Sequence, residues 1–285
     1  MRGSFDAITL LRPKTEAEAL KAYAEHPKAL PLAGGTDFMV NFNMGLLNRR
    51  AVLDLSRLSS WTKIQKTKTG VRLGALVTHA QIQAHPLVRK EFPLLVEACA
   101  TVGAAQIQNR GTIGGNIANA SPAGDTFPPL SVYEAVVHVV SASERRAVPF
   151  GEIFAGVKKT TLLPGELIAA VELPFLRAKP AKRLFRKIGT RAAQSISKAV
   201  AAGLLWLEPD GRVKELRFAL GSMAPTVRRL RAAEAAVLGK QATPAVIEQA
   251  CLFLTENVSP IDDIRSTREY RLFVAQNLLR QFLTR

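Results

Sequence analysis

The sequence predicts a protein of the α+β class that is built from two parts. Over the first 176 residues, short apolar segments alternate with helical periodicity, whereas the remainder starts with two long apolar stretches and continues with three helical ones. The 285 residues are 47% hydrophobic and 22% charged, which is the balance of a globular chain with a sizeable core. No apolar run approaches the roughly 20 residues of a membrane span, so we expect no integral membrane segment.

The N-terminal part begins with a helix and two strands. Thr15 and Glu18 have the spacing of a capping box, and apolar residues continue at helical intervals through residues 15–26. Short apolar strands are predicted at 29–32 and 51–55, and a Gly-Gly turn follows the first of them.

The middle of the chain supplies three more strands and a helix. Strands are predicted at 71–76, 136–140 and 168–173, where Val, Ile and Leu gather in short runs. A helix is predicted over 86–102, and Pro93 marks a break within it because proline cannot donate the hydrogen bond that continues a helix.

Pro174 and Pro180 mark a domain boundary near residue 176. Beyond it, two antiparallel strands at 195–207 and 213–221 are joined by a Pro-Asp-Gly turn. Three helices are then predicted, over 230–238, 244–256 and 267–283.

Start signals support two of these helices. Thr243 is a capping residue in front of Pro244, which suits the first turn of a helix. Ser266 and Glu269 have the spacing of a second capping box.

The positive charge of the chain is concentrated in its C-terminal part. The net charge of +16 divides into +5 for residues 1–176 and +11 for residues 177–285, and residues 177–191 hold seven basic side chains and no acidic one. Such asymmetry fits nucleic acid, a membrane surface, an acidic cofactor or an acidic partner subunit. Aromatic residues are only 6% and no nucleic-acid motif is present, so we expect no nucleic-acid partner.

The cysteines and histidines predict no metal site. Cys99 and Cys251 are too few for a disulfide framework or a paired-cysteine metal motif, and buried thiols indicate a reducing, cytoplasmic compartment. The chain also cannot hold an all-cysteine iron–sulfur cluster by itself. Its four histidines are scattered, and its N-terminus has no continuous apolar stretch, so no signal peptide is predicted.

Two glycine-containing segments carry chemical information. Residues 30–37 read LPLAGGTD, and residues 109–117 read NRGTIGGNI. Adjacent glycines permit positive φ and let amide groups converge on an anion such as a diphosphate. Thr36 and Thr112 add hydroxyl donors, and Asn116 can either donate to a phosphate or brace the opposite loop.

Neither segment is a dinucleotide fingerprint or a phosphate loop of the usual spacing, and each alone is more often a structural turn. Their combination with the segment ASPAGD is more specific, because Asp125 follows Asn116 by nine residues. A carboxylate does not favour a diphosphate, so Asp125 is expected to accept hydrogen bonds from sugar-like hydroxyls. The pattern therefore predicts a long ligand that has both a diphosphate and a polyol.

At these residues the sequence resembles the flavin-binding medium subunit of the molybdenum hydroxylases, a family that includes bacterial xanthine dehydrogenase, carbon monoxide dehydrogenase and aromatic-acyl hydroxylating enzymes. The motifs LAGGTD, NRGTIGGN and SPAGD carry the resemblance, and RKIGTR, SIS, GSMAPT and DIRSTREYR extend it over the whole chain. It implies an FAD-binding domain of the vanillyl-alcohol-oxidase (PCMH) type over 1–176, with α/β subdomains at about 1–57 and 58–176. Residues 177–285 would form a small α+β domain of three strands and three helices.

The resemblance also implies the residues that bind FAD without a covalent bond. Residues 31–38 and 112–116 would cradle the diphosphate and Asp125 the ribitol, while Arg186 would approach from the second domain and no residue would be catalytic. The remaining positions lie near the flavin ring or the adenine. The full set is Pro31, Leu32, Ala33, Gly34, Gly35, Thr36, Asp37, Phe38, Thr78, His79, Val102, Gly103, Gln106, Thr112, Ile113, Gly114, Gly115, Asn116, Asp125, Ile168 and Arg186.

Two positions depart from the family pattern. Val102 stands where some relatives have an aromatic residue, and Gln108 replaces a commoner basic residue. Both changes bear on the redox tuning of the flavin and neither opposes FAD binding.

The implied function is an electron-transfer subunit. Substrate oxidation would take place at a molybdenum cofactor on a large subunit, and electrons would pass through iron–sulfur clusters of a small subunit to FAD and then to an external acceptor, in a dimer of heterotrimers. Two alternatives remain at this point: a free-standing flavin-dependent oxidoreductase of the same fold, and a basic binding module without enzymatic activity.

Overall fold

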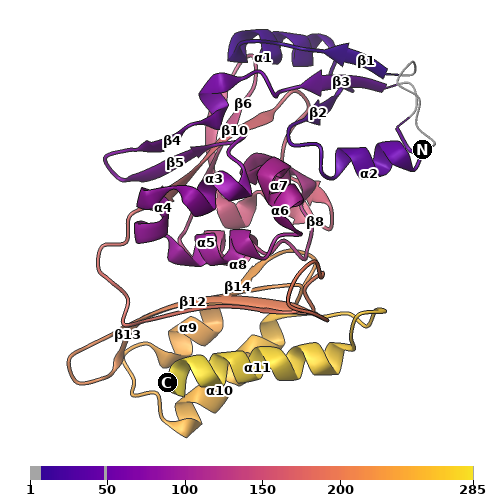
Figure 1. The fold of residues 1–285 in the computed structure, drawn as a ribbon. Helices are drawn as coiled ribbons and strands as arrows, with labels where there is room; N and C mark the ends of the chain where they lie inside the picture. Colours follow the sequence, from indigo (N-terminus) through magenta and orange to yellow (C-terminus); the bar gives the residue numbers. More distant parts are fainter. Residues whose placement is uncertain (1–7, 48–49, 285) are drawn as a thin grey trace.

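The computed structural model describes residues 8–47 and 50–284 (Figure 1). Its N-terminal subdomain is a parallel sheet in the order β1-β3-β2, formed by β1 (Ile8–Leu11), β2 (Leu30–Leu32) and β3 (Arg50–Asp54), with helices α1 (Glu16–Glu25) and α2 (Phe38–Asn43). Thr15 caps α1 as predicted, because its hydroxyl accepts from the amide of Glu18 at 3.2 Å. The Glu18 carboxylate accepts from the amide of Lys14 instead of closing the expected box on Thr15.

The second subdomain is built on a five-stranded antiparallel sheet in the order β4-β5-β10-β6-β7. Its strands are β4 (Ile64–Lys66), β5 (Gly70–Gly74), β6 (Val136–Val140), β7 (Arg145–Pro149) and β10 (Leu167–Pro174). The 3₁₀ turns η2 (Ser59–Thr62) and η3 (Phe150–Glu152) and the hairpin of β8 (Phe154–Gly156) and β9 (Lys159–Thr160) complete the sheet layer. The three strands predicted from apolar runs in this region are thereby confirmed, with ends that differ by one or two residues.

Six short helices cover this sheet and separate it from the C-terminal part (Figure 1). They are α3 (His79–Ala84), α4 (Pro86–Glu91), α5 (Pro93–Ala100), α6 (Ala105–Arg110), α7 (Ile113–Asn119) and α8 (Phe127–Val132). The predicted break is confirmed, because Pro93 is the first residue of α5 and separates it from α4. The predicted helix ends earlier than expected, at Ala100 instead of 102.

The C-terminal part is an antiparallel sheet in the order β11-β12-β13-β14 with three helices on one face. Its elements are β11 (Lys182–Ile188), β12 (Ala199–Leu207), β13 (Val213–Gly221), β14 (Arg228–Arg229), α9 (Arg231–Val237), α10 (Pro244–Asn257) and α11 (Arg268–Thr284). The three predicted helices are confirmed, while the two-residue β14 adds a fourth strand to the three that were expected. β12 begins at Ala199 and not at 195.

The helix starts show one correct and one wrong prediction. Thr243 accepts from the amide of Val246 at 3.4 Å and caps α10. The predicted cap at Ser266 is wrong, because Thr267 accepts from the amide of Tyr270 at 3.3 Å, whereas Ser266 pairs with Asp263 in a β-bridge.

The sheet of β12 and β13 lies between two apolar layers (Figure 1). Ala202, Leu204 and Trp206 of β12 pack into the core of the N-terminal part, and Ala201 and Leu205 pack against the C-terminal helices. Because side chains alternate along a strand, each face of this sheet belongs to a different core. In the described parts of the chain, no helix has the length and apolar character to cross a membrane. Residues 1–7, on which the prediction of no signal peptide partly rests, lie outside the description.

Candidate functional site

A cleft of about 890 Å³ opens between the two N-terminal subdomains. Fifteen of the residues predicted to bind a cofactor line it, and they come from segments far apart in the sequence. They are Pro31, Leu32, Ala33, Gly34, Gly35, Thr36, Asp37, Phe38, His79, Val102, Thr112, Gly114, Gly115, Asn116 and Ile168. The fold therefore brings the two glycine-containing segments together at one site.

The two segments touch through their backbones at Gly34. A Cβ atom at this position would lie 1.8 Å from the carbonyl oxygen of Arg110, a distance that no side chain can have. Gly35 follows with φ +80°, in the left-handed region that glycine adopts at little cost. Glycine is thus required at 34 for the close approach and at 35 for the backbone conformation.

The amide groups of residues 34–37 are available to a ligand. Within residues 8–47 and 50–284, none of these four N–H groups has a hydrogen-bond acceptor. Residues 34–36 are half-buried and Asp37 is exposed, so these donors face the open cleft. Four consecutive free backbone donors along a cleft form a site for anionic oxygens. This arrangement fits the diphosphate of a dinucleotide cofactor.

The second segment differs from the expected loop. Thr112 caps helix α7, with its hydroxyl accepting from the amide of Gly115 at 3.1 Å. The amides of Ile113, Gly114 and Asn116 also donate within the protein, so among residues 112–116 only the amide of Thr112 lacks an acceptor in the described chain. The glycines of this segment need no positive φ. Position 114 requires glycine, because a Cβ there would lie 2.6 Å from the Cβ of Ala75.

Asn116 is held by the residue that follows the third predicted segment. Its Oδ1 atom accepts from the hydroxyl of Thr126 at 2.5 Å. The side-chain oxygen therefore contacts the residue after ASPAGD and not the opposite glycine segment, and donation to a phosphate stays a prediction.

Four predicted residues lie beside the cleft instead of lining it. Thr78 forms a capping box with Gln81 at the start of α3. Ile113 is fully buried. Gly103 makes a turn with φ +54°, and Gln106 is exposed on α6.

Asp125 also lies outside the lining of the cleft, and its carboxylate is engaged by a lysine. Its Oδ2 atom is 2.6 Å from Nζ of Lys187, which also donates to the carbonyl of Thr101 at 2.8 Å. Burial raises the pKa of Asp125, and the ammonium of Lys187 opposes this shift. The Oδ1 atom is buried without a hydrogen-bond partner among the described residues, so it can still accept a hydroxyl donor.

The expected position of Arg186 requires a correction. Arg186 is exposed and lies on the face of β11 that carries Leu184 and Ile188, both of which pack against the C-terminal helices. Phe185 and Lys187 alternate to the other face and contact the N-terminal part. Because of this alternation the basic residue that reaches the FAD-binding part is Lys187, one position later than expected.

His79 is a buried member of the lining. Its Nδ1 atom lies 3.5 Å from Sγ of Cys99, and its ring packs beside Gly111, where a Cβ would be 3.2 Å from the ring carbon Cδ2. Burial lowers the pKa of His79 to about 4, so the imidazole is neutral at neutral pH. Burial also raises the pKa of the Cys99 thiol.

One wall of the cleft was not predicted apart from its last residue, Ile168. It follows the β8–β9 hairpin and contributes Thr160, Leu162, Leu163, Pro164, Glu166 and Leu167. The sequence contains one indication of this wall, an apolar Leu-Leu-Pro-Gly run that is separated by one residue from a buried strand.

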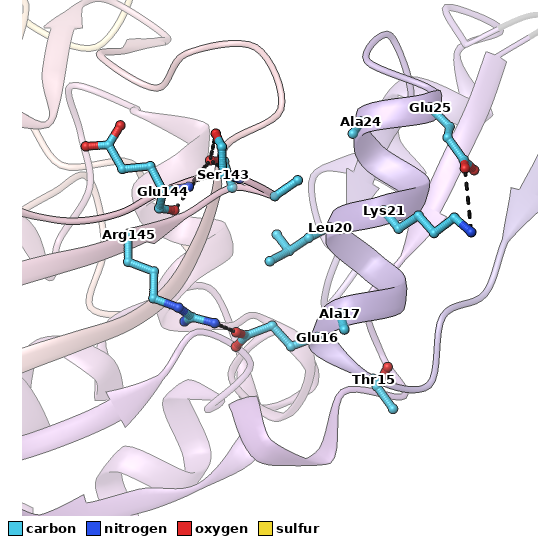
Figure 2. A pocket seen from close by; sticks show the side chains of 12 residues that line it. Thr15, Glu16, Ala17, Leu20, Lys21, Ala24, Glu25, Ser143, Glu144 and Arg145 are labelled. Atoms are coloured by element: carbon cyan, nitrogen blue, oxygen red, sulfur yellow. Dashed lines mark hydrogen bonds and ion pairs between the residues drawn. The ribbon is translucent and has the colours of Figure 1, made fainter.

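A second, more open groove lies between α1 and the turn that joins β6 and β7 (Figure 2). Figure 2 shows Arg145 reaching across it to the carboxylate of Glu16. None of the predicted cofactor residues lines this groove. Within the described chain, no group of three or more His, Cys, Asp or Glu side chains is placed to hold a metal ion.

Comparison with known proteins gives two family matches that together span most of the chain. Residues 4–176 match the FAD binding domain in molybdopterin dehydrogenase, and residues 184–285 match the CO dehydrogenase flavoprotein C-terminal domain. The chain is 28% identical over 271 residues to the glyceraldehyde dehydrogenase medium chain of Sulfolobus acidocaldarius, with 95% of each chain covered. It is 26% identical over 276 residues to the carbon monoxide dehydrogenase medium chain of Hydrogenophaga pseudoflava, with 95% of this chain and 94% of that one covered.

Solved structures agree with these matches. Carbon monoxide dehydrogenase from Hydrogenophaga pseudoflava lacking the Mo-pyranopterin moiety superposes with a TM-score of 0.91 at 27% identity, covering 97% of this chain and 96% of that one. Quinoline 2-oxidoreductase from Pseudomonas putida 86 gives a TM-score of 0.90 at 25% identity, with coverages of 99% and 97%. The chain therefore belongs to the FAD-binding medium subunits of the molybdenum hydroxylase family.

Proposed function

We propose that the cleft binds FAD and that the four free amides of residues 34–37 hold its diphosphate. This proposal rests on one observation above all: the only described amides of the glycine segments that lack an acceptor lie along the cleft. FAD supplies, when bound, reversible one- and two-electron redox chemistry, and the protein supplies position and electrostatics.

Other residues would orient the two ends of the cofactor. We place the flavin ring beside His79, which contacts Gly111 just before α7, and beside Val102, which also lines the cleft. The neutral imidazole adds no charge there. The buried Oδ1 of Asp125 would accept a ribitol hydroxyl, with Lys187 holding the carboxylate in position. Ile168 would pack on the adenine side.

We further propose that the chain transfers electrons within a larger enzyme. Its relatives include proteins named as medium chains of glyceraldehyde and carbon monoxide dehydrogenases. Electrons would come from iron–sulfur clusters on a small subunit, substrate would be oxidised on a large molybdenum subunit, and the assembly would be a cytoplasmic dimer of heterotrimers. FAD binding would belong to residues 1–176, and residues 177–285 would form the second domain.

The test is flavin content. We expect the purified chain to be yellow and acid precipitation to release all of the flavin as FAD, because no His or Cys lies in either glycine segment. Gly34→Ala should abolish flavin retention, because the new Cβ would force the Arg110 carbonyl away. Gly151→Ala is the matched control, since a Cβ there has no atom within 4 Å. Full flavin occupancy in Gly34→Ala would refute the assignment of the cleft.

A further inference from the structure

One motif of the sequence takes no part in the cleft. The segment DIRSTREYR covers residues 263–271 and runs into α11, which lies on the far side of the β12–β13 sheet from the N-terminal part (Figure 1). Its last residue, Arg271, is only 2% exposed, although a guanidinium is always charged. A buried charge must be paired and hydrogen-bonded, so the contacts of Arg271 indicate what the motif holds together.

Arg271 connects α11 to the ends of two neighbouring strands. Its Nη1 atom donates to the carbonyl of Lys198, directly before β12, at 2.6 Å, and to that of Ser222, directly after β13, at 3.4 Å. Its Nη2 atom donates to Oδ1 of Asp263 at 2.8 Å. Arg265 also donates to Asp263, at 3.0 and 2.6 Å, so this carboxylate is compensated without Arg271. What Arg271 adds is the link between the helix and the two strand ends.

Serines at these strand ends contact the ASPAGD segment. The hydroxyls of Ser197 and Ser222 lie 2.9 Å apart. The amide of Ser222 donates to the carbonyl of Pro122 at 2.8 Å, and the hydroxyl of Ser197 donates to that of Ala123 at 3.5 Å. Ser222 has φ +62°, in the left-handed region that serine seldom adopts, so its surroundings must hold it there. The bonds to Pro122 and Arg271 fix its backbone on both sides.

Ser197 extends this arrangement to Asp125. The serine is fully buried, and Asp125 follows its acceptor Ala123 by two residues. Burial raises the pKa of Asp125, and the side chains of Lys187 and Ser197 both oppose this shift, since both lie beside the carboxylate. The direction in which Asp125 offers its free Oδ1 atom therefore depends on the position of Ser197.

We propose that Arg271 is a positioning residue for the flavin site: by holding the backbone at Lys198 and Ser222 it sets the position of Ser197, and through Ser197 the orientation of the Asp125 carboxylate. The inference rests on the proposed function, in which Asp125 accepts a ribitol hydroxyl. Arg271 does not line the cleft, and its described contacts do not include Asp125. It acts from the helix side of the sheet, so the C-terminal helix determines part of the affinity for the flavin.

Two variants interrupt this arrangement at its two ends. Arg271→Lys replaces the planar fork with a single ammonium group, which cannot reproduce the contacts to the carboxylate and to both carbonyls. Ser197→Ala removes the hydroxyl beside Asp125. Arg280→Lys is the matched control, because Arg280 lies on the same helix and makes a two-pronged pair with Glu248 of α10 instead of reaching the strand ends.

The experiment measures the Kd of the full, deflavinated chain for FAD by flavin fluorescence, with each variant made in the unaltered chain and in Asp125→Ala. An oriented acceptor binds more tightly than a mobile one, so Arg271→Lys and Ser197→Ala should each raise the Kd at least fourfold in the unaltered chain. The increase should not exceed that of Asp125→Ala itself. In the Asp125→Ala chain both should change the Kd less than twofold, because the group that they orient is gone. The control should stay within twofold in both chains.

An equal loss of affinity with and without Asp125 would show that the two residues only stabilise the fold, and would overturn the inference. Unchanged affinity in either folded variant, or a loss in the Arg280→Lys control, would overturn it as well. If Arg271→Lys has no cooperative unfolding transition, Ser197→Ala decides by the same criteria. Unchanged affinity in Asp125→Ala would refute the inference and leave FAD binding by the cleft intact. Failure of the unaltered chain to bind FAD would instead refute the proposed function.

Discussion

Lys187 and Asp125 form an ion pair of 2.6 Å between the two parts of the chain, and each side chain is less than one tenth exposed. The lysine comes from β11, and the aspartate precedes α8. Through its second hydrogen bond, to the carbonyl of Thr101, Lys187 also holds the backbone next to Val102 in the cleft. The pair therefore couples the placement of the C-terminal part to the proposed ring-binding end of the site.

The first prediction separates two roles of Asp125. If its free Oδ1 accepts a ribitol hydroxyl, Asp125→Ala should weaken FAD binding by about 1–3 kcal/mol, the range for hydrogen bonds to a charged group. Asp125→Asn retains an acceptor and should weaken binding less. Flavin dissociation constants measure both, and unchanged affinity in the Ala variant would leave Asp125 with only its structural pairing to Lys187.

The second prediction concerns pH. Because burial lowers the pKa of His79 from 6.5 to about 4, the unfolded chain takes up this proton first as the pH falls. The contribution of His79 to the free energy of unfolding is therefore complete above pH 6.5. It should be lost as the pH falls from 6.5 to 4, and the loss is about 3 kcal/mol at most. His79→Gln should flatten the dependence of the free energy of unfolding on pH in this range. Equal slopes in the unaltered protein and the His79→Gln variant would contradict the assignment.

The third prediction concerns the arginines at the boundary between the two parts. Arg229 is one tenth exposed, pairs with the buried Glu234 and donates to the carbonyl of Ser131 at 3.2 Å. Arg229→Met would leave Glu234 without its closest cation, so we expect a loss of about 3 kcal/mol in the free energy of unfolding. Arg231 contacts the same carboxylate at 3.7 Å but is two-thirds exposed. Arg231→Met should cost less than about 1 kcal/mol in the same denaturant titration.

The fourth prediction concerns the basic stretch 177–191. Lys179 and Arg183 are exposed, whereas Lys182 is partly buried. If the exposed charges meet an acidic partner subunit, Lys179→Glu/Arg183→Glu should weaken subunit assembly, and the difference from the unaltered chain should shrink as salt rises. Because Arg186 is exposed and does not line the cleft, Arg186→Ala should leave the flavin potential unchanged. Unchanged assembly of the double variant at low salt would refute this role.

The sequence was sufficient for those features that depend on local chemistry. The caps at Thr15 and Thr243, the break at Pro93 and the glycines at 34 and 35 each follow from a backbone requirement of one or two residues. Ten of the fifteen predicted residues that line the cleft belong to the short motifs LAGGTD and TIGGN, and the other five follow from the family resemblance.

Features that depend on the partner of a side chain were not predictable in this way. Nothing in the sequence shows that Asp125 meets Lys187, or that Arg271 contacts Lys198, because these contacts form between segments whose relative placement only the fold determines. Arg186 and Lys187 are adjacent basic residues, and a shift of one position along a strand reverses the face that each occupies. Residues 161–166 have neither helical nor strand periodicity, so their position in the cleft could not be predicted from the sequence.

The sheet of β12 and β13 has a consequence for how the chain loses its structure. Its two faces complete two different cores, so the parts on either side of the predicted boundary near residue 176 share this sheet. Neither part can melt without exposing an apolar face of the other, and cooperative unfolding in one thermal transition is what such a shared layer produces. A fragment ending at residue 176 would present the bare surfaces of α5 and α8 to water and would aggregate. For recombination between relatives, the exchangeable unit is the whole chain and not either part alone.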